Sequence, residues 1–431
     1  MGIANPVIVV PGITGTYLRD EYPLPFETVW SVLTKDYERL SLHPDNIRYE
    51  AIEPARLKPD QVYEIAYKEL VQELRHNLTQ KADEPVPVFP FGYDWRQPLD
   101  MIEEQLSAFV WEVIERTQLL KYYYDVSYGV DPKVNLVGHS MGGLIITGYL
   151  ERYGAKAPVA KVATLATPFR GSYEAVIKIS TGTANLGTSE PSSREREAAR
   201  VMPGLYHLLP SCPGVEAENG LPISLFDPAI WQPSILQTLE EYVRLYSVTP
   251  EDTGKRAMDL FAALLAAAQG HRNRLENFRL EKAGLTAKDW LCVVGVDSTT
   301  RVRLKVIKTP TGPDFQFRSI DRDNQWSPAN DPAVRIFTGD GTVPFEGALS
   351  AFLAPENVVC VTPDDYGYWE IQDKLVTKVA GFHGILPNMD MLHRLIVRHF
   401  TGAPDDHGNT WGRPAPGITH WQPPLDLNPK E

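Results

Sequence analysis

The chain has 431 residues, of which 43% are hydrophobic and 23% charged, an ordinary composition for a globular protein. Its formal net charge of -13 and isoelectric point near 5.3 argue against nucleic-acid binding and against simple electrostatic adsorption to anionic lipid. The three cysteines are too few and too scattered for a disulfide framework or a zinc site, so we expect buried free thiols.

The amino-terminal residues carry no recognisable targeting signal. Residues 1–6 have neither a basic segment nor the apolar core of a signal peptide. No run of the sequence approaches the roughly 18 apolar residues of a membrane-spanning helix. We therefore expect a cytoplasmic protein, with secretion after removal of a leader left open as the alternative.

The first half of the chain alternates predicted strands and helices. Residues 7–10 are continuously apolar, which is typical of a parallel strand covered on both faces. Residues 17–60 are irregular in pattern and predict a lid-like insertion, the alternative being a loop packed on the core. Apolar residues at helical spacing predict a helix over 61–79, then a strand at 86–91 and a helix that begins near Pro98. This alternation predicts a parallel sheet with right-handed crossovers.

The most informative stretch is residues 133–150, where an apolar strand runs into an apolar helix. Gly138-His139-Ser140-Met141-Gly142 lies between them and matches the pattern G-x-S-x-G. In a strand-turn-helix context this pattern holds the serine on a sharp turn, with its hydroxyl pushed out at the edge of the sheet. We therefore predict that Ser140 is a nucleophile; the alternative is a glycine-rich turn whose serine only caps the helix.

The second half of the chain predicts a helical cap and then further strands. A strand at 159–167 precedes residues 173–288, which we interpret as a cap insertion. Its apolar helix at 258–268 packs inside the cap or, alternatively, touches lipid with one face. The remaining predicted elements are strands at 290–296, 334–337 and 358–361, a hairpin at 301–307 and 315–320, a helix at 389–400, and a Pro-rich tail at 402–431.

A serine hydroxyl needs a base and a residue that orients the base. In the α/β-hydrolase order the acid follows the serine and the histidine comes last. Asp340 follows a predicted buried strand in a glycine-flanked turn, and His383 lies in a glycine-flanked loop near the end of the sheet. Competing positions are Asp297, Asp331, Asp364 and Asp365 for the acid, and His393, His399, His407 and His420 for the base.

Two backbone amides are candidates for an oxyanion hole. The amide of Met141 follows the predicted nucleophile, and the amide of Ile13 follows the first strand, where hydrolases of this build supply a second donor. The alternative for Ile13 is a plain turn. This chemistry requires no metal and no organic cofactor.

Six motifs together resemble lecithin:cholesterol acyltransferase and its lysosomal phospholipase A2 relatives. The motifs follow the family's order from residue 7 to about residue 400. The resemblance implies one α/β-hydrolase domain over 1–431, with a mostly parallel central sheet, helices on both faces, and lid and cap insertions. It also implies Ser140, Asp340 and His383 as the triad. The motifs are Val10-Pro11-Gly12-Ile13, Tyr93-Asp94-Trp95-Arg96, Gly138 to Gly143, Thr167 to Ser172, Gly339 to Pro344, and His383.

The favoured hypothesis is a serine acyl-ester hydrolase, lipase- or phospholipase-like, that works through an acyl-enzyme. An acyltransferase that moves a fatty acyl group from a phospholipid to an alcohol is the alternative, and a catalytically silent binding protein is a third. The expected partner is a lipid or small acyl ester, with peripheral membrane contact as an open question and no nucleic acid. The sequences of the lid and cap diverge from those of the family, so the head group and acyl acceptor do not carry over.

Overall fold

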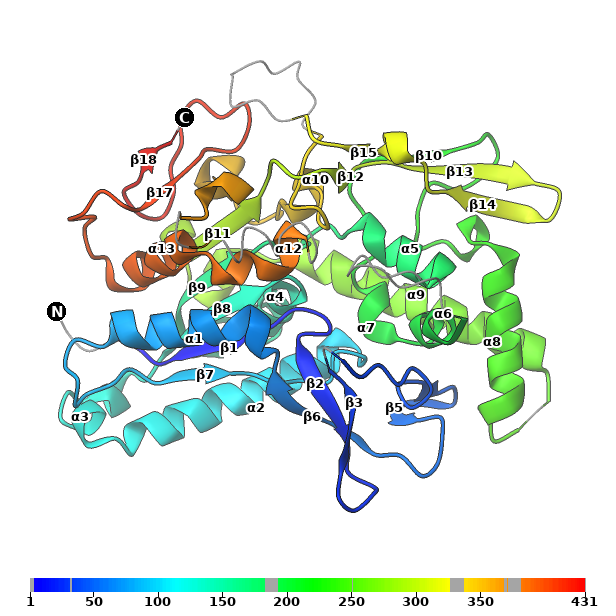
Figure 1. Ribbon diagram of the computed structural model, residues 1–431, viewed down its shortest axis with the longest axis horizontal. Coiled ribbons are helices and arrows are strands. Elements are labelled where there is room, and N and C mark those ends of the chain that lie inside the picture. Colours follow the sequence, from blue (N-terminus) through cyan, green and yellow to red (C-terminus); the bar gives the residue numbers. More distant parts are fainter. Residues whose placement is uncertain are drawn as a thin grey trace.

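A parallel six-stranded sheet forms the centre of the protein (Figure 1). The computed structural model describes residues 4–31, 33–182, 193–249, 251–325, 337–367, 370 and 381–430. The sheet has the order β16-β11-β9-β8-β1-β7, and all five pairings are parallel. Its strands are β1 (Val7–Val10), β7 (Val88–Pro90), β8 (Val134–His139), β9 (Val159–Leu165), β11 (Trp290–Gly295) and β16 (Val358–Val361).

Helices cover both faces of this sheet because alternate residues of each strand point to opposite sides. Val7 and Val9 pack in the hydrophobic cluster of the helices α1 (Glu64–Leu78) and α13 (Asp390–Thr401). Ile8 and Val10 pack in the cluster that holds three helices of the other face. Those helices are α2 (Leu99–Gln118), α4 (Met141–Tyr153) and α9 (Thr253–Asn277). The predicted α/β architecture is therefore confirmed.

One predicted core position of α1 was wrong. Ile65 fits the helical spacing of the buried face but is 57% exposed, whereas Leu70, Leu74 and Leu78 are buried as predicted. The buried face of α1 in its first turn is formed instead by Ala66 and Tyr67, and Ile65 lies outside it.

The lid-like segment 17–60 is not irregular, and the prediction missed its strands. The strands β2 (Thr16–Asp20), β3 (Glu27–Trp30) and β6 (Leu57–Val62) form one small antiparallel sheet. A second pair consists of β4 (Leu42–His43) and β5 (Asn46–Glu50). The strands are short and rich in charged residues and proline, so they lack the apolar alternation by which strands are recognised.

The cap region is mainly helical, as predicted, but it contributes one strand that the sequence did not reveal. Residues 215–217 form β10, which pairs in parallel with β13 of the predicted hairpin. The hairpin itself is confirmed and consists of β13 (Leu304–Thr309) and β14 (Gly312–Gln316). The other helices of this region are α5 (Tyr173–Thr181), α6 (Ser193–Arg200), α7 (Pro203–Tyr206) and α8 (Pro233–Tyr246).

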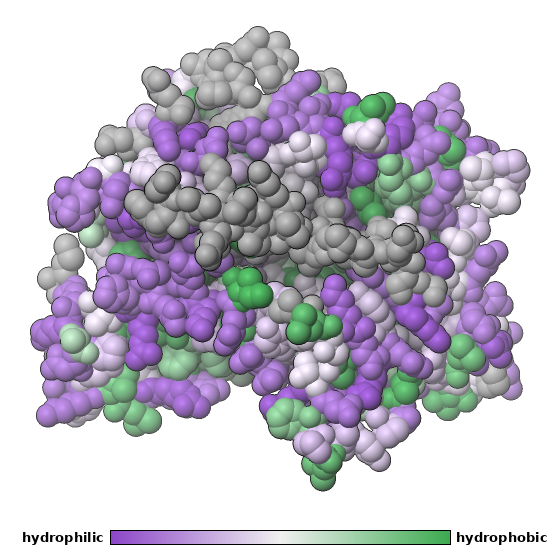
Figure 2. Space-filling view, viewed as in Figure 1, coloured by the Kyte–Doolittle hydropathy of each residue, from purple (hydrophilic) through white to green (hydrophobic). Residues whose placement is uncertain are grey.

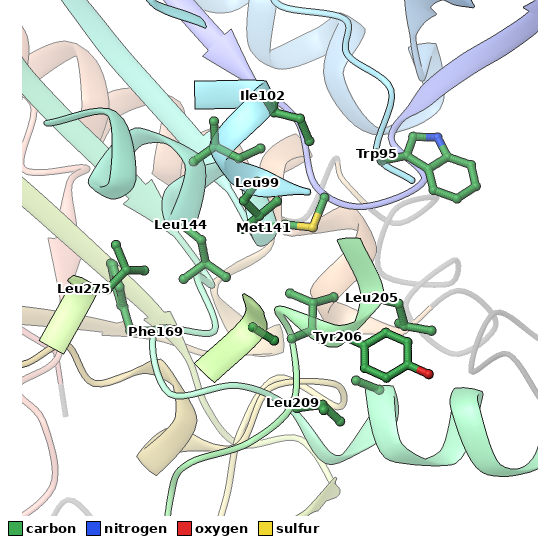
Figure 3. Packing of buried hydrophobic residues seen from close by; sticks show 14 of the residues in the cluster. Trp95, Leu99, Ile102, Met141, Leu144, Phe169, Leu205, Tyr206, Leu209 and Leu275 are labelled. Atoms are coloured by element: carbon green, nitrogen blue, oxygen red, sulfur yellow. The ribbon is translucent and has the colours of Figure 1, made fainter. Parts of the chain in front are cut away.

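The side chains at the junction of cap and sheet domain form one continuous apolar core (Figure 3). Leu99 of α2, Met141 of α4, and Leu205 and Tyr206 of α7 are all buried members of this cluster and are labelled in Figure 3. Leu275 of the long cap helix α9 belongs to the same cluster. The predicted cap helix at 258–268 thus lies within α9, whose buried face includes Phe261 and Leu265.

The Pro-rich tail is attached to the sheet domain by strand pairing and a buried carboxylate. Its strands β17 and β18 pair with each other, and Cys360 of β16 forms a bridge with Arg413. Asp365 accepts hydrogen bonds from Trp411, Arg413 and Lys430 of the tail. The remaining strands and α-helices are α3 (Lys121–Tyr124), β12 (Thr300–Arg301), β15 (Arg322–Asp323), α10 (Phe345–Ala348), α12 (Phe382–Ile385), β17 (Trp411–Gly412) and β18 (Asn428–Pro429). The short 3-10 helices are η1 (Tyr128–Val130), η2 (Gly154–Lys156), η3 (Pro228–Ile230), η4 (Leu280–Ala283), η5 (Ala287–Asp289), η6 (Ser319–Asp321), η7 (Pro355–Asn357), η8 (Pro363–Asp365) and η9 (Leu386–Asn388).

Three further sequence predictions concern a strand, the cysteines and membrane-spanning helices. Residues 334–336 of the strand predicted at 334–337, and the acid candidate Asp331, lie outside the described residues. The cysteines Cys212, Cys292 and Cys360 are buried and free, as predicted. Among the described residues, no helix is both long and apolar enough to cross a membrane.

Candidate active site

Ser140 lies on a sharp turn between strand β8 and helix α4. Its backbone has φ 53° and ψ −126°, in the positive-φ region that L-residues rarely adopt. Two glycines make this turn sterically feasible. A Cβ at Gly142 would lie 2.2 Å from the carbonyl oxygen of Val10, and one at Gly138 would lie 2.8 Å from the amide of Gly143. Gly142 is therefore required by the close approach of α4 to β1, and Gly138 by the close approach of α4 to β8.

The structure brings the three predicted catalytic side chains together at the carboxyl ends of the strands. The Nε2 atom of His383 lies 2.9 Å from Oγ of Ser140, and its Nδ1 atom lies 2.7 Å from Oδ2 of Asp340. Because a carboxylate accepts, Nδ1 of His383 carries the hydrogen and Nε2 of the neutral ring is free to accept from the serine hydroxyl. Positions 140, 340 and 383 thus form one directional hydrogen-bonded series.

Asp340 is buried and held in one orientation by its own turn. Its Oδ1 atom accepts hydrogen bonds from the amides of Thr342 (2.9 Å) and Val343 (2.7 Å). The side chain is 1% exposed, and Asp340 itself bridges to Ser298, just beyond β11. The amide bonds occupy one oxygen of the carboxylate and leave the other for His383. This fixed geometry suits a group that orients a base.

Two hydrogen bonds hold the backbone of His383, one at its amide and one at its carbonyl oxygen. Its amide donates a hydrogen bond to the carbonyl oxygen of Asp340 at 3.0 Å. Its carbonyl oxygen lies 3.0 Å from Nε2 of His139. The short helix α12 therefore presents the imidazole to Ser140 from a backbone that is bonded to two other segments.

The competing residues lie elsewhere. Asp297 accepts a hydrogen bond from Asn324, and Asp365 fastens the carboxyl-terminal tail. The rings of His393 and His399 bond to backbone carbonyls of Pro387 and Val162. The other competitors are Asp364, His407 and His420, and the last two are exposed.

The two predicted oxyanion donors both border the serine. Met141 is the first residue of α4, so its amide belongs to the helix end that begins at Ser140. The loop that carries Ile13 is in direct contact with the turn at Ser140, because a Cβ at Gly12 would lie 2.9 Å from Cβ of Ser140. Within the described part of the chain, neither amide donates a hydrogen bond to another residue. Their role in catalysis stays a prediction.

Two residues at the site were missed by the sequence analysis. Tyr67 of α1 bonds to His139, the residue before the serine, with its hydroxyl 2.7 Å from Nδ1 of the ring. The same hydroxyl accepts a hydrogen bond from the amide of Gly12 at 2.8 Å. His139 stands inside the motif and could have been suspected, whereas Tyr67 occupies an ordinary core position of a helix and gives no signal.

The reacting groups are almost closed off from solvent. Ser140 is 6% exposed, and the side chain of His383 is 12% exposed. A cavity of about 1060 Å³ lies between α6, α8, the β13–β14 hairpin and residues 37–41, but Ser140 does not line it. Among the described residues, no group of three or more His, Cys, Asp or Glu side chains could hold a metal ion.

Comparison with known proteins agrees with the motifs. Residues 49–240 match the model of the family described as lecithin:cholesterol acyltransferase. The predicted resemblance to this family is confirmed. The chain is 27% identical over 248 residues to "Lecithin-cholesterol acyltransferase-like 4" of Arabidopsis thaliana, which covers 49% of this chain. The match spans 42% of that relative's length, less than half of it.

A solved structure shows the same fold over nearly the whole chain. "The crystal structure of Tle4-Tli4 complex" matches 94% of this chain and 100% of its own, with a TM-score of 0.56 at 15% identity. At this identity the likeness speaks for the fold alone. With the parallel sheet and its two helical layers, it confirms the predicted α/β-hydrolase fold.

Proposed function

We propose that the protein is a serine acyl-ester hydrolase that acts on lipid esters through a covalent acyl-enzyme. The observation that carries the proposal is the hydrogen-bonded series from Ser140 through His383 to Asp340, at 2.9 and 2.7 Å. The match of residues 49–240 to a family of lipid acyltransferases supports the lipid ester as substrate.

In the proposed reaction the Oγ atom of Ser140 attacks the ester carbonyl while Nε2 of His383 takes its proton. Asp340 keeps the hydrogen on Nδ1 and offsets the positive charge of the imidazolium. The amides of Ile13 and Met141 stabilise the oxyanion, where loss of one donor typically costs about 10²–10³ in rate. His383 then gives its proton to the leaving alcohol, and water, activated by the same ring, releases the acyl group.

The decisive experiment is labelling of the serine with a fluorophosphonate probe, followed by ester cleavage with p-nitrophenyl esters and phospholipids. We expect the probe to label Ser140, and Ser140→Ala to abolish both labelling and turnover. Ser350, whose hydroxyl accepts a hydrogen bond from a nearby amide, provides a matched control in Ser350→Ala. Full activity of Ser140→Ala would refute the proposal. An unlabelled but well-folded wild type would favour a silent binding protein instead.

The name of the matching family favours a second candidate, transfer of the acyl group to an alcohol rather than to water. The same acyl-enzyme serves both reactions, and only the acceptor differs. Product analysis with a phospholipid and an added long-chain alcohol separates them. A free fatty acid as the sole product supports hydrolysis, and a new ester supports acyl transfer.

We further propose peripheral contact with lipid through the tip of the β2–β3 hairpin. Tyr22, Leu24 and Phe26 at this tip are 61%, 94% and 55% exposed. Figure 2 shows hydrophobic surface at the lower end of the molecule, where the hairpin projects in Figure 1. Because the chain is acidic, the contact is apolar, and Leu24→Asp should reduce binding to zwitterionic vesicles in flotation. Unchanged flotation would exclude this contact.

A further inference from the structure

A buried hydrogen-bonded chain runs behind the serine from the loop after β1 to the backbone of His383. The amide of Gly12 lies 2.8 Å from Oη of Tyr67, and that oxygen lies 2.7 Å from Nδ1 of His139. Nε2 of His139 lies 3.0 Å from the carbonyl oxygen of His383. Tyr67 and His139 are each 3% exposed, so water does not compete for these bonds.

The chemistry of the partners fixes the direction of every bond in this chain. The carbonyl oxygen of His383 can only accept, so Nε2 of His139 carries a hydrogen and donates it. Nδ1 of the neutral ring then accepts from the hydroxyl of Tyr67. The oxygen of Tyr67 keeps a lone pair for the amide of Gly12. Each donor faces one acceptor, and reversal at any point would leave a buried group unpaired, which is costly.

The protonation states that this direction needs are maintained by burial. Burial lowers the pKa of His139 well below its usual range, and the nearby His383 lowers it further. Burial also raises the pKa of the Tyr67 hydroxyl. His139 therefore stays neutral and Tyr67 stays protonated across the neutral pH range, so the chain does not rearrange when the site takes up or gives off a proton.

The chain joins three segments that are far apart in the sequence. Gly12 immediately precedes Ile13, His139 immediately precedes Ser140, and the last acceptor is the backbone of His383 itself. Tyr67 adds helix α1 as the support of all three. The carbonyl oxygen of Pro11 accepts from the hydroxyl of Tyr93 at 2.7 Å, so both polar atoms of the Pro11–Gly12 peptide group are bonded to tyrosine hydroxyls.

We propose that Tyr67 and His139 are positioning residues. They hold the loop of Ile13, a proposed oxyanion donor, and the proposed base His383 in place relative to Ser140 during acyl transfer. Neither residue touches the substrate in this role, and both act through the segments they hold. The proposal rests on the proposed function, because it assigns these residues to the reaction of Ser140.

The kinetic test uses two variants that place a phenyl ring at each position and remove the hydrogen bonds. We expect Tyr67→Phe to lower kcat for a p-nitrophenyl ester about tenfold and His139→Phe about 30-fold, with KM changed less than about threefold. His139→Gln can still offer an N–H to the carbonyl of His383, so it should recover most of the loss. In the double variant Tyr67→Phe/His139→Phe the losses should not add, because both belong to one chain.

Two buried residues elsewhere provide matched controls. The hydroxyl of Tyr123 donates a hydrogen bond to the carbonyl oxygen of Ala4 at 2.8 Å. The Nε2 atom of His399 lies 3.1 Å from the carbonyl oxygen of Val162. Tyr123→Phe and His399→Phe remove similar bonds to backbone carbonyls and should destabilise the protein to a similar degree. Their kcat should stay within about twofold of wild type. Equal losses of kcat in control and test variants would overturn the positioning role.

A second readout does not depend on turnover. In ¹⁵N NMR of histidine-labelled wild type, with the signal assigned by its absence in His139→Gln, we expect His139 as the neutral Nε2–H tautomer from pH 5.5 to 8.5. Protonation in that range, or the Nδ1–H tautomer, would overturn the hydrogen-bonded chain. A wild type that no fluorophosphonate labels, yet shows this tautomer, would instead refute the proposed function. Failure of the two proposals is thus distinguishable.

Discussion

Among the described residues, two histidine–carboxylate pairs have a carboxylate that is almost fully buried, and one of the two faces a hydroxyl. At the candidate site Nδ1 of His383 lies 2.7 Å from Asp340, and under the cap Nε2 of His271 lies 2.8 Å from Glu103. Both carboxylates are at most 1% exposed. The two pairs are alike in distance and burial, so these properties alone do not identify a catalytic pair.

The difference lies in the charges around each carboxylate. Glu103 is already approached by two arginines, Arg274 at 3.0 Å and Arg152 at 3.4 Å. Burial raises the pKa of Glu103 to about 7, and these two arginines keep it from rising further. Burial and the neighbouring arginines lower the pKa of His271 to about 3. This histidine cannot take up a proton near neutral pH.

Asp340 is approached by neutral amides instead of arginines. In the part of the chain that the structure describes, its ion-pair partner is His383 and its other bonds come from backbone N–H groups. In the proposed mechanism, its negative charge is thus left to stabilise the imidazolium that forms when the ring accepts a proton from Ser140. We therefore propose that the absence of a neighbouring arginine, among the described residues, distinguishes the candidate catalytic pair from the structural one.

The largest effect should come from removing the carboxylate charge at the site. Asp340→Asn should lower kcat about 10³- to 10⁴-fold, since the amide no longer fixes the hydrogen on Nδ1 of His383 or offsets its charge. Glu103→Gln is the matched change in the other pair and should leave kcat within about threefold. Steady-state kinetics on one ester measures both. Comparable losses in the two variants would break the distinction between the pairs.

The next largest effect should be on stability, when the His271–Glu103 pair under the cap loses the neighbouring Arg274. Arg274→Ala should lower the free energy of unfolding by about 2–3 kcal/mol, because the pKa of buried Glu103 then rises further and the carboxyl takes up a proton on folding. The estimate stays below that for a fully isolated pair because Arg152 remains. Urea unfolding measures the change, and Arg244→Ala, at an exposed surface pair, should leave the unfolding midpoint nearly unchanged. Equal costs would mean that Glu103 does not depend on Arg274.

A smaller effect should follow from adding a methyl group at Gly142, in the tight turn around Ser140. A Cβ at Gly142 would lie 2.2 Å from the carbonyl oxygen of Val10, a backbone atom that cannot move aside. Gly142→Ala should therefore destabilise the protein by about 1–3 kcal/mol and also lower kcat. Gly270, with no neighbour within 4 Å of such an atom, is the control, and Gly270→Ala should be neutral or stabilising. A fully active Gly142→Ala would contradict the close approach of α4 to β1.

The smallest effect concerns how the free energy of unfolding changes at low pH through His271 of the His271–Glu103 pair. The folded pKa of His271, about 3, is below the usual 6.5, so its contribution to stability is complete above pH 6.5 and is lost as the pH falls toward 3. The wild type should thus lose up to about 1.4 kcal/mol per pH unit more than His271→Gln between pH 6 and 4. Urea unfolding at several pH values measures this slope. Parallel slopes would show that His271 becomes charged inside the fold.

The sequence predicted the sheet and the positions of the three site residues because these features leave local patterns. Continuous apolar runs mark buried parallel strands, and the glycines around Ser140 follow from backbone contacts that no side chain permits. Asp340 and His383 were selected by chain order and loop position, and the structure places them within hydrogen-bond distance. Their catalytic roles and that of the oxyanion amides stay predictions.

What the sequence could not predict depends on contacts between distant segments. Glu103 fits the polar pattern of a helix surface, but it is fully buried because α9 supplies Arg274 from a position 171 residues away. Tyr67 looks like any apolar helix position, and its hydroxyl acquires a role only when His139 lies beside it. Strand β10 has three residues and exists because β13 pairs with it. Such residues carry no periodic signal of their own.

The parallel pairing of β10 with β13 has a practical consequence for engineering. It ties the cap region to the hairpin that follows β11, and Arg322 beyond the hairpin also contacts Glu174 at the start of the cap. A transplant of residues 173–288 alone would leave the donor β10 without its partner strand and the recipient hairpin with an open edge. Exchange of this region between relatives should therefore include β13 and β14 together with β10, so that all three strands of this small sheet come from the same protein.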